Sequence, residues 1–246
     1  MIESAIKNYL GRTGYKTFDI KGIMFDMDGV LFDSMPLHAE AWVKTFESIG
    51  IPFTKRQVYL NEGRTGAATI DDEFIKHFGR HSTGSEQQDI YRTKSSIFKQ
   101  MPKPNLIPGI TDVLRYLSDK NIARTVVTGS GESTTLDRIE LNFPGIFDRS
   151  MMVTAADVKQ GKPFPEPYLM GLQKLGLAPN EAIVVENAPM GIQAGVAAGV
   201  FTIGVNTGIL EKSDLANAGA DLVFDNMQQL LGALRIMISR ENDRIA

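Results

Sequence analysis

Residues 20–34, IKGIMFDMDGVLFDS, join an apolar segment to a cluster of acidic side chains. The apolar half predicts a buried strand that runs to Asp26, and a glycine-bearing turn, MDG, follows at residues 27–29. If the chain stays extended here, the carboxylates of Asp26 and Asp28 point to the same side, because side chains alternate along a strand. A turn that is merely rich in aspartate is the alternative interpretation of this short motif.

The C-terminal part of the chain alternates apolar strands with helix-sized segments. The further strand candidates are residues 122–129, 150–155, 182–187, 200–206 and 221–225. Near-continuous apolar strands separated by helices predict an α/β fold, with a Rossmann-like parallel sheet and helices on both faces. In such sheets, functional side chains gather at the carboxyl ends of the strands.

A helical insert interrupts this pattern. Helical runs are expected near residues 36–50, 66–78 and 86–100, and the proline-rich segment 101–109 ends the insert. We therefore expect a core of residues 18–33 and 105–246, with an inserted helical domain at 34–104. Residues 1–17 form a further extension, in which a short helix over residues 2–10 is expected to lie outside the core.

Composition excludes several functions. The 246 residues carry a net charge of -3, so no basic surface is available for nucleic acid or an anionic membrane. Zero cysteines exclude thiolate zinc sites, disulfides and a thiol nucleophile. No continuous apolar stretch has the length of a signal peptide core or a membrane span, so we expect a cytoplasmic protein, either a monomer or a weak homo-oligomer.

Polar side chains follow the strand candidates. Thr128, Gly129 and Ser130 lead into a helix expected to begin at ESTTL, where a hydroxyl and free backbone N–H groups suit phosphate, although such residues are also ordinary helix caps. Lys162 lies in the turn QGKPFPEP, where an exposed surface lysine is the alternative. Glu186 ends the apolar strand AIVV.

Together these side chains supply what phosphoryl transfer requires. A carboxylate attacks phosphorus, a second carboxylate moves a proton, and an ammonium group and Mg²⁺ balance the charge. The combination is much more specific than any of its members.

The order and spacing of these motifs resemble the haloacid dehalogenase superfamily, in its beta-phosphoglucomutase-like subgroup with a helical cap, from about residue 20 to 226. The resemblance implies that Asp26 forms an aspartyl phosphate and that Asp28 is the acid and base. It also implies that Thr128 binds the phosphoryl group, that Lys162 balances charge, and that Glu186 belongs to a Mg²⁺ site with both aspartates.

The motif that usually reads Glu-Asp-Ser is Glu186-Asn187-Ala188 here. An asparagine carbonyl still ligates Mg²⁺ but adds no negative charge, so we expect Asn187 to be a weaker member of the metal site.

In the insert, which resembles the subgroup's cap, the candidate substrate-binding residues are His38, Arg64 and Lys94, joined by Gly129 and Ser130 of the core. His38 is expected either to govern the proton on Asp28 or to be an ordinary partly buried histidine. Trp42 is expected in the cap core, and Lys94 on a solvent-exposed helix face.

Three functions remain open at this point, and the resemblance favours the first of them, because the GRTG turn at residues 63–66 has no arginine at the position expected for a mutase's distal-phosphate arginine. The first is a phosphatase that acts on a small phosphorylated sugar or related metabolite. The second is a beta-phosphoglucomutase that interconverts beta-glucose 1-phosphate and glucose 6-phosphate. The third is a non-catalytic binding protein on the same scaffold, which Asn187 and Ala188 alone support.

Overall fold

The computed structural model describes residues 1–130 and 134–242. Its centre is a five-stranded parallel sheet with the strand order β2-β1-β3-β4-β5. The strands are β1 (Gly22–Phe25), β2 (Ala123–Val126), β3 (Ala182–Glu186), β4 (Phe201–Val205) and β5 (Leu222–Phe224). The predicted parallel sheet is confirmed, and β1 lies between β2 and β3.

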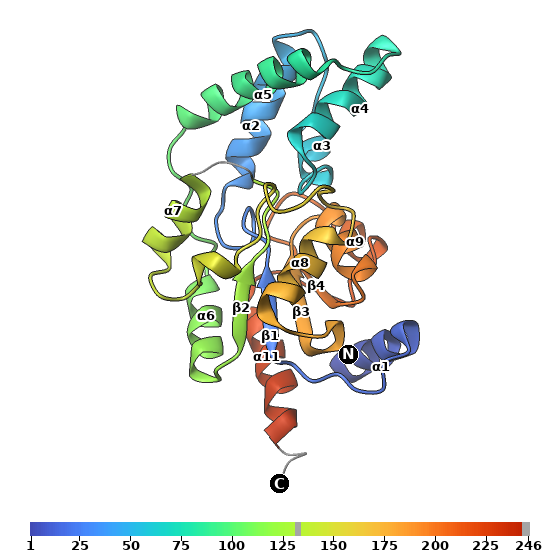
Figure 1. The fold of residues 1–246 in the computed structure, drawn as a ribbon, viewed down its shortest axis with the longest axis vertical. Coiled ribbons are helices and arrows are strands. Elements are labelled where there is room, and N and C mark those ends of the chain that lie inside the picture. Colours follow the sequence, from blue (N-terminus) through green and yellow to red (C-terminus); the bar gives the residue numbers. More distant parts are fainter. Residues whose placement is uncertain (131–133, 243–246) are drawn as a thin grey trace.

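Helices surround this sheet and also extend beyond it (Figure 1). They are α1 (Ile2–Thr13), α2 (Met35–Glu47), α3 (Lys55–Leu60), α4 (Gly66–Phe78), α5 (Gly84–Lys99), α6 (Ile110–Asp119), α7 (Thr134–Asn142), α8 (Glu166–Leu175), α9 (Pro189–Ala197), α10 (Lys212–Asn217) and α11 (Met227–Asn242). None of the described helices combines the length and the apolar character that a membrane span requires.

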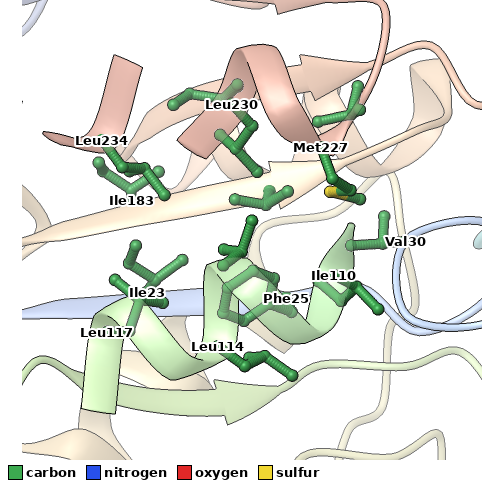
Figure 2. Close-up of a cluster of buried hydrophobic side chains, with 14 of the residues drawn as sticks. Ile23, Phe25, Val30, Ile110, Leu114, Leu117, Ile183, Met227, Leu230 and Leu234 are labelled. Carbon is green, nitrogen blue, oxygen red and sulfur yellow. The ribbon is translucent and has the colours of Figure 1, made fainter. Parts of the chain in front are cut away.

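Both faces of the sheet are covered by helices, as predicted. On one face, Ile23, Phe25 and Ile183 pack against apolar side chains of α6 and α11 (Figure 2). On the other face, Met24 and Val184 pack against α8 and α9. Strand side chains alternate between these two clusters, so β1 is buried on both sides and its carboxyl end is held rigidly.

One strand prediction was wrong. Residues 150–155 do not form a strand: Arg149–Met151 is a 3-10 helix, and only Val153 makes an isolated bridge, to Val127. The segment still lies beside the sheet, because the amide of Thr128 donates to the carbonyl of Val153. The apolar residues of this segment therefore correctly predicted that it is buried, but they did not show whether it pairs as a strand of the sheet.

Helices α2–α5, called the cap helices below, lie together at one end of the molecule (Figure 1). They share a hydrophobic cluster that includes Trp42, Phe46 and Phe74, so Trp42 is a core residue as expected. The polypeptide enters and leaves this group of helices at one place, where the amide of Asp33 donates to the carbonyl of Asn105 at 2.8 Å.

Helix α1 forms as predicted, but the expectation that it lies outside the core was wrong. Tyr9 is fully buried and belongs to the same hydrophobic cluster as the sheet. Its hydroxyl donates to the carbonyl of Gly199 at 2.9 Å, and Arg12 pairs with Asp221 at 2.9 Å. Helix α1 thus covers the amino ends of β4 and β5, far from the cap helices.

Removing the Tyr9 hydroxyl should destabilise the protein without changing its chemistry. We expect Tyr9→Phe to cost about 1 kcal/mol of unfolding free energy, and Tyr9→Ala about 3–5 kcal/mol, because the second change also leaves a cavity. Urea unfolding measures both values, with Lys7→Ala on the exposed face of α1 as the control. Equal stability of all three variants would show that α1 does not contribute to the core.

Candidate active site

Six polar side chains predicted from sequence meet at the carboxyl end of the sheet, and all of them are buried. They are Asp26, Asp28, Thr128, Lys162, Glu186 and Asn187. Because β1 is central, Thr128 after β2 and Glu186 at the end of β3 flank Asp26 on either side. The amide of Asp26 donates to the carbonyl of Val185, which fixes the backbone at this point.

Lys162 is the centre of this group and not a surface residue. Its Nζ lies 2.5 Å from Asp26 Oδ1 and 2.6 Å from Glu186 Oε1, and it also donates to the carbonyl of Val127 at 3.1 Å. Burial alone would lower the pKa of Lys162, but the charges of Asp26 and Glu186 outweigh it and raise that pKa. Lys162 is therefore a permanent cation beside Asp26.

Both oxygens of Glu186 are engaged by the protein. Its Oε1 accepts from Lys162 and from the hydroxyl of Tyr168, which lies 2.7 Å away, and its Oε2 accepts from the amide of Asn187. The sequence analysis missed Tyr168, because nothing distinguishes this tyrosine from other apolar residues of α8. Glu186 thus orients the lysine that contacts Asp26.

Asp28 is surrounded by donors from separate elements. Ser34 Oγ lies 2.5 Å from its Oδ1, His38 Nε2 lies 3.4 Å away, and Arg138 lies 3.7 Å away. Burial favours the neutral acid, but His38, Arg138 and Ser34 together hold the pKa of Asp28 well below its usual range. Asp28 is therefore ionised in this arrangement.

Ser34 and Arg138 were also missed. Ser34 closes the FDMDGVLFDS motif, so its position was a usable signal for contact with the aspartates. Arg138 lies on α7, far away in sequence, and no local pattern marks it.

His38 connects Asp28 to the cap helices. Its Nδ1 lies 2.8 Å from Lys94 Nζ, and its ring stacks on Phe98 with the centroids 4.2 Å apart. An ammonium group only donates, so Nδ1 is the acceptor and the ring proton lies on Nε2, which faces Asp28. Burial and the charge of Lys94 lower the pKa of His38, which favours this neutral form.

The expected exposure of Lys94 was wrong. Only 5% of this residue is exposed, and its ammonium group lies over the rings of Trp42, Tyr91 and Phe98. The many charged residues of α5 did not indicate that one of its faces is buried. On that face, aromatic side chains of α2 and α5 surround the ammonium group of Lys94.

The donor atoms near Asp26 suit a hard cation. Asp26 Oδ2 and Asn187 Oδ1 are buried oxygens that have no hydrogen-bond partner among the described residues. Burial raises the pKa of Asp26 to about 8 although Lys162 opposes it, and the charges of Glu186 and Asp28 add to the rise. The site is thus short of positive charge, and oxygen ligands are what Mg²⁺ prefers.

Asn187 reaches this position because of a glycine. Gly29 has φ +88°, and a Cβ on it would lie 2.1 Å from Asn187 Nδ2. In the described part of the chain, no three histidine, cysteine, aspartate or glutamate side chains form a metal cluster by themselves. A side chain at residue 29 would displace the amide of Asn187 from its place beside the aspartates.

The predicted phosphate site is partly described. Thr128 Oγ1 accepts from the amide of Ser130 at 3.1 Å, and the hydroxyls of Ser130 and Thr135 lie 2.8 Å apart. The expected helix start at ESTTL includes residues 131–133, which lie outside the described residues. Thr128 and Lys162 both line a small side pocket of about 120 Å³.

A cavity of about 670 Å³ separates the cap helices from the carboxyl end of the sheet. It brings together all five predicted substrate-binding residues: His38, Arg64, Lys94, Gly129 and Ser130. Arg64 forms an ion pair with Asp72, and Asp28 lies in the cavity wall. Its size suits a small molecule and not a macromolecule.

The sequence model described as "Haloacid dehalogenase-like hydrolase" matches residues 23–205. The chain is 31% identical over 222 residues to a phosphorylated carbohydrates phosphatase of Thermotoga maritima, covering 88% of this chain and 99% of that protein. It is 32% identical over 215 residues to hexitol phosphatase A of Escherichia coli, covering 85% and 93%.

Among solved structures, a Bacteroides vulgatus protein with a provisional beta-phosphoglucomutase name is 49% identical to this chain. The TM-score is 0.93, and the match covers 97% of both chains. The fold and most of the length are thus shared with relatives named for both kinds of phosphoryl transfer.

Proposed function

The chain belongs to the haloacid dehalogenase-like hydrolase family, and the relatives described above are named as phosphatases and as a phosphosugar mutase. From this premise we propose that the chain is a Mg²⁺-dependent phosphatase of small phosphorylated sugars or related polyols. The observation that carries the proposal is the state of Asp26: one carboxyl oxygen is held by Lys162, and the other is buried and has no hydrogen-bond partner in the part of the chain that the structure describes. A fixed, unpaired carboxylate oxygen is a suitable nucleophile.

The reaction proceeds in two steps. Asp26 attacks phosphorus, the bond to the leaving oxygen breaks, and an aspartyl phosphate forms. In this step the protonated form of Asp28 gives its proton to the leaving oxygen and becomes a carboxylate. That carboxylate then removes a proton from water, which attacks phosphorus; the bond between Asp26 and phosphorus breaks, phosphate is released, and Asp28 is protonated again. The ionised Asp28 of the structure is the form that activates water.

Cap residues control the surroundings of Asp28. His38 presents its Nε2 proton to Asp28, and Lys94 holds the ring in this tautomer. The cap also excludes water from the cavity, which strengthens electrostatic interactions there. Thr128 and Lys162 hold the transferring phosphoryl group, in keeping with their shared side pocket.

The proposed metal ligands are Asp26, Asp28 and Asn187, with Glu186 behind them because Lys162 and Tyr168 already engage its carboxylate. Bound Mg²⁺ supplies positive charge beside the phosphoryl oxygens.

A beta-phosphoglucomutase is the second candidate, supported by the 49% identical relative. A phosphate-release assay separates the two. The protein is incubated with Mg²⁺ and a panel of sugar phosphates, and separately with beta-glucose 1-phosphate and a trace of glucose 1,6-bisphosphate. Steady phosphate release supports the phosphatase, whereas glucose 6-phosphate without free phosphate supports the mutase. No turnover of any substrate, p-nitrophenyl phosphate included, would indicate a binding protein.

Converting the neutral metal-site residue to an acid should strengthen cation binding. We expect Asn187→Asp to lower the Mg²⁺ concentration for half-maximal activity by about tenfold, because an added charge is worth about 1.4 kcal/mol in a partly desolvated site. Titration calorimetry with Mg²⁺ provides a second readout that is independent of turnover. Unchanged Mg²⁺ binding in the variant would contradict a metal role for residue 187.

A further inference from the structure

Glu62 is a carboxyl group in the cavity wall that the proposed chemistry does not use. It lies in the turn of residues 61–65 between α3 and α4, and it lines the same cavity as Asp28. This turn packs directly on the catalytic loops: a Cβ on Gly63 would lie 2.8 Å from Lys162 Cδ, and a Cβ on Gly129 would lie 3.0 Å from the Gly63 carbonyl oxygen. The position of Glu62 relative to the reacting end of the cavity is therefore fixed.

The cationic side chains near Glu62 are hydrogen-bonded or ion-paired to other side chains, whereas Glu62 has no such bond within the described part of the chain. Arg64 pairs with Asp72, and Lys94 contacts His38. Across residues 1–130 and 134–242, no hydrogen bond or ion pair involves the side chain of Glu62. Burial, with the charges of Asp28 and Asp26, raises the pKa of Glu62 well above its usual range. A partly buried carboxyl group in such surroundings needs a hydrogen-bonding partner from outside the chain.

We propose that Glu62 determines specificity by receiving a hydroxyl group of the substrate and by rejecting a second phosphate at that position. The inference rests on the proposed phosphatase function and narrows its substrate class to monophosphates of hydroxylated compounds. A carboxyl group that keeps its proton, as the raised pKa of Glu62 favours, both donates to and accepts from a hydroxyl group, whereas a phosphate dianion at this position would meet the ionised Asp28. A site built for a hydroxyl group discriminates strongly against substrates that lack it.

The cations at the cavity mouth have a different role. Lys99 and Lys103 line the cavity but are exposed, so they attract anionic substrates in general. Selection between one and two phosphates therefore falls to the inner wall, where Glu62 lies.

The test compares Glu62→Ala and Glu62→Gln with the wild type on matched pairs of substrates. The pairs are fructose 1-phosphate with fructose 1,6-bisphosphate, and glucose 6-phosphate with glucose 1,6-bisphosphate, and p-nitrophenyl phosphate serves as a substrate without sugar hydroxyls. Asp89→Asn, which removes an exposed carboxylate from cap helix α5, is the control for net charge. It should behave as the wild type on all substrates.

We expect Glu62→Ala to raise KM for the better monophosphate by about tenfold or more, while kcat/KM for p-nitrophenyl phosphate changes by less than about twofold. Glu62→Gln keeps a hydrogen-bonding amide, so KM for the monophosphate should stay within about threefold. The amide and the protonated acid are both neutral and both donate and accept, so the preference for monophosphate over bisphosphate should also stay within about threefold in Glu62→Gln. It should fall by about tenfold in Glu62→Ala, which removes the partner of the substrate hydroxyl group.

Two results would overturn the assignment of Glu62. One is an unchanged monophosphate preference in both variants, and the other is an equal loss on p-nitrophenyl phosphate, which would indicate a structural role. Calorimetric binding of the same sugar phosphates to Asp26→Asn, with and without Glu62→Ala, decides the point without turnover. Absence of hydrolysis by the wild type would refute the phosphatase function, while the binding preference still tests Glu62.

Discussion

Replacing Asp26 by asparagine should lower phosphate release by about 10⁴-fold or more while the protein remains folded. The amide is close in size to the carboxylate. Its oxygen takes the position of Oδ1, which lies 2.5 Å from Lys162 Nζ, and still accepts a hydrogen bond from that lysine. What is lost is the second carboxyl oxygen, which has no hydrogen-bond partner among the described residues and which attacks phosphorus in the proposed mechanism. The effect should therefore fall on kcat and not on stability.

Initial rates with p-nitrophenyl phosphate, together with thermal unfolding, measure both properties. Asp33→Asn is the matched control, because Asp33 lies in the same motif but is exposed. After rapid quenching, mass spectrometry should find a phosphoryl group on the peptide with Asp26 in the wild type only. Retained turnover in Asp26→Asn would refute the covalent mechanism.

Replacing Lys162 by methionine should damage both activity and stability. Only 3% of this residue is exposed, and its removal leaves Asp26 and Glu186 as buried carboxylates without their shared cation. Loss of one partner from a buried ion pair costs about 3–5 kcal/mol. Phosphate release should fall as well, since the cation that faces the phosphoryl group is gone.

Urea unfolding of a double-mutant cycle tests the electrostatic origin of this loss. If repulsion between unpaired carboxylates destabilises Lys162→Met, then adding Asp26→Asn should restore part of the unfolding free energy. Lys44→Met is a surface control, since Lys44 forms an exposed pair with Glu40 and should change stability by less than about 0.5 kcal/mol. An additive cycle would contradict the proposed coupling between Lys162 and Asp26.

The parts of the site that sequence predicted are those that follow strands. Asp26, Thr128 and Glu186 were found because apolar strands end at them, and parallel strands bring their carboxyl ends to one edge. The sheet itself was predictable for the same reason, since near-continuous apolar strands have few other solutions.

The residues that sequence missed act through contacts that only the tertiary fold creates. Tyr168, Arg138 and Glu62 lie on helices or turns with no local pattern, and each meets its site across a large separation in sequence. Lys94 was assigned to solvent because a charged helix does not show which aromatic rings will cover it. Residues 150–155 were wrongly predicted to be a strand, because a buried irregular segment and a strand of a sheet have the same apolar sequence pattern.

The hydrogen bond between Asp33 and Asn105 has a consequence for how this enzyme can change. The core already holds the two ends of the cap segment side by side, so a longer or shorter segment alters the closure entropy only slightly, by about 0.6 kcal/mol for each doubling of length. A new cap can therefore be exchanged at this junction while β1 and its aspartates stay in place. The exception is His38, which contacts Asp28 from the cap, so a new cap keeps the same proton transfer only if it supplies an equivalent contact.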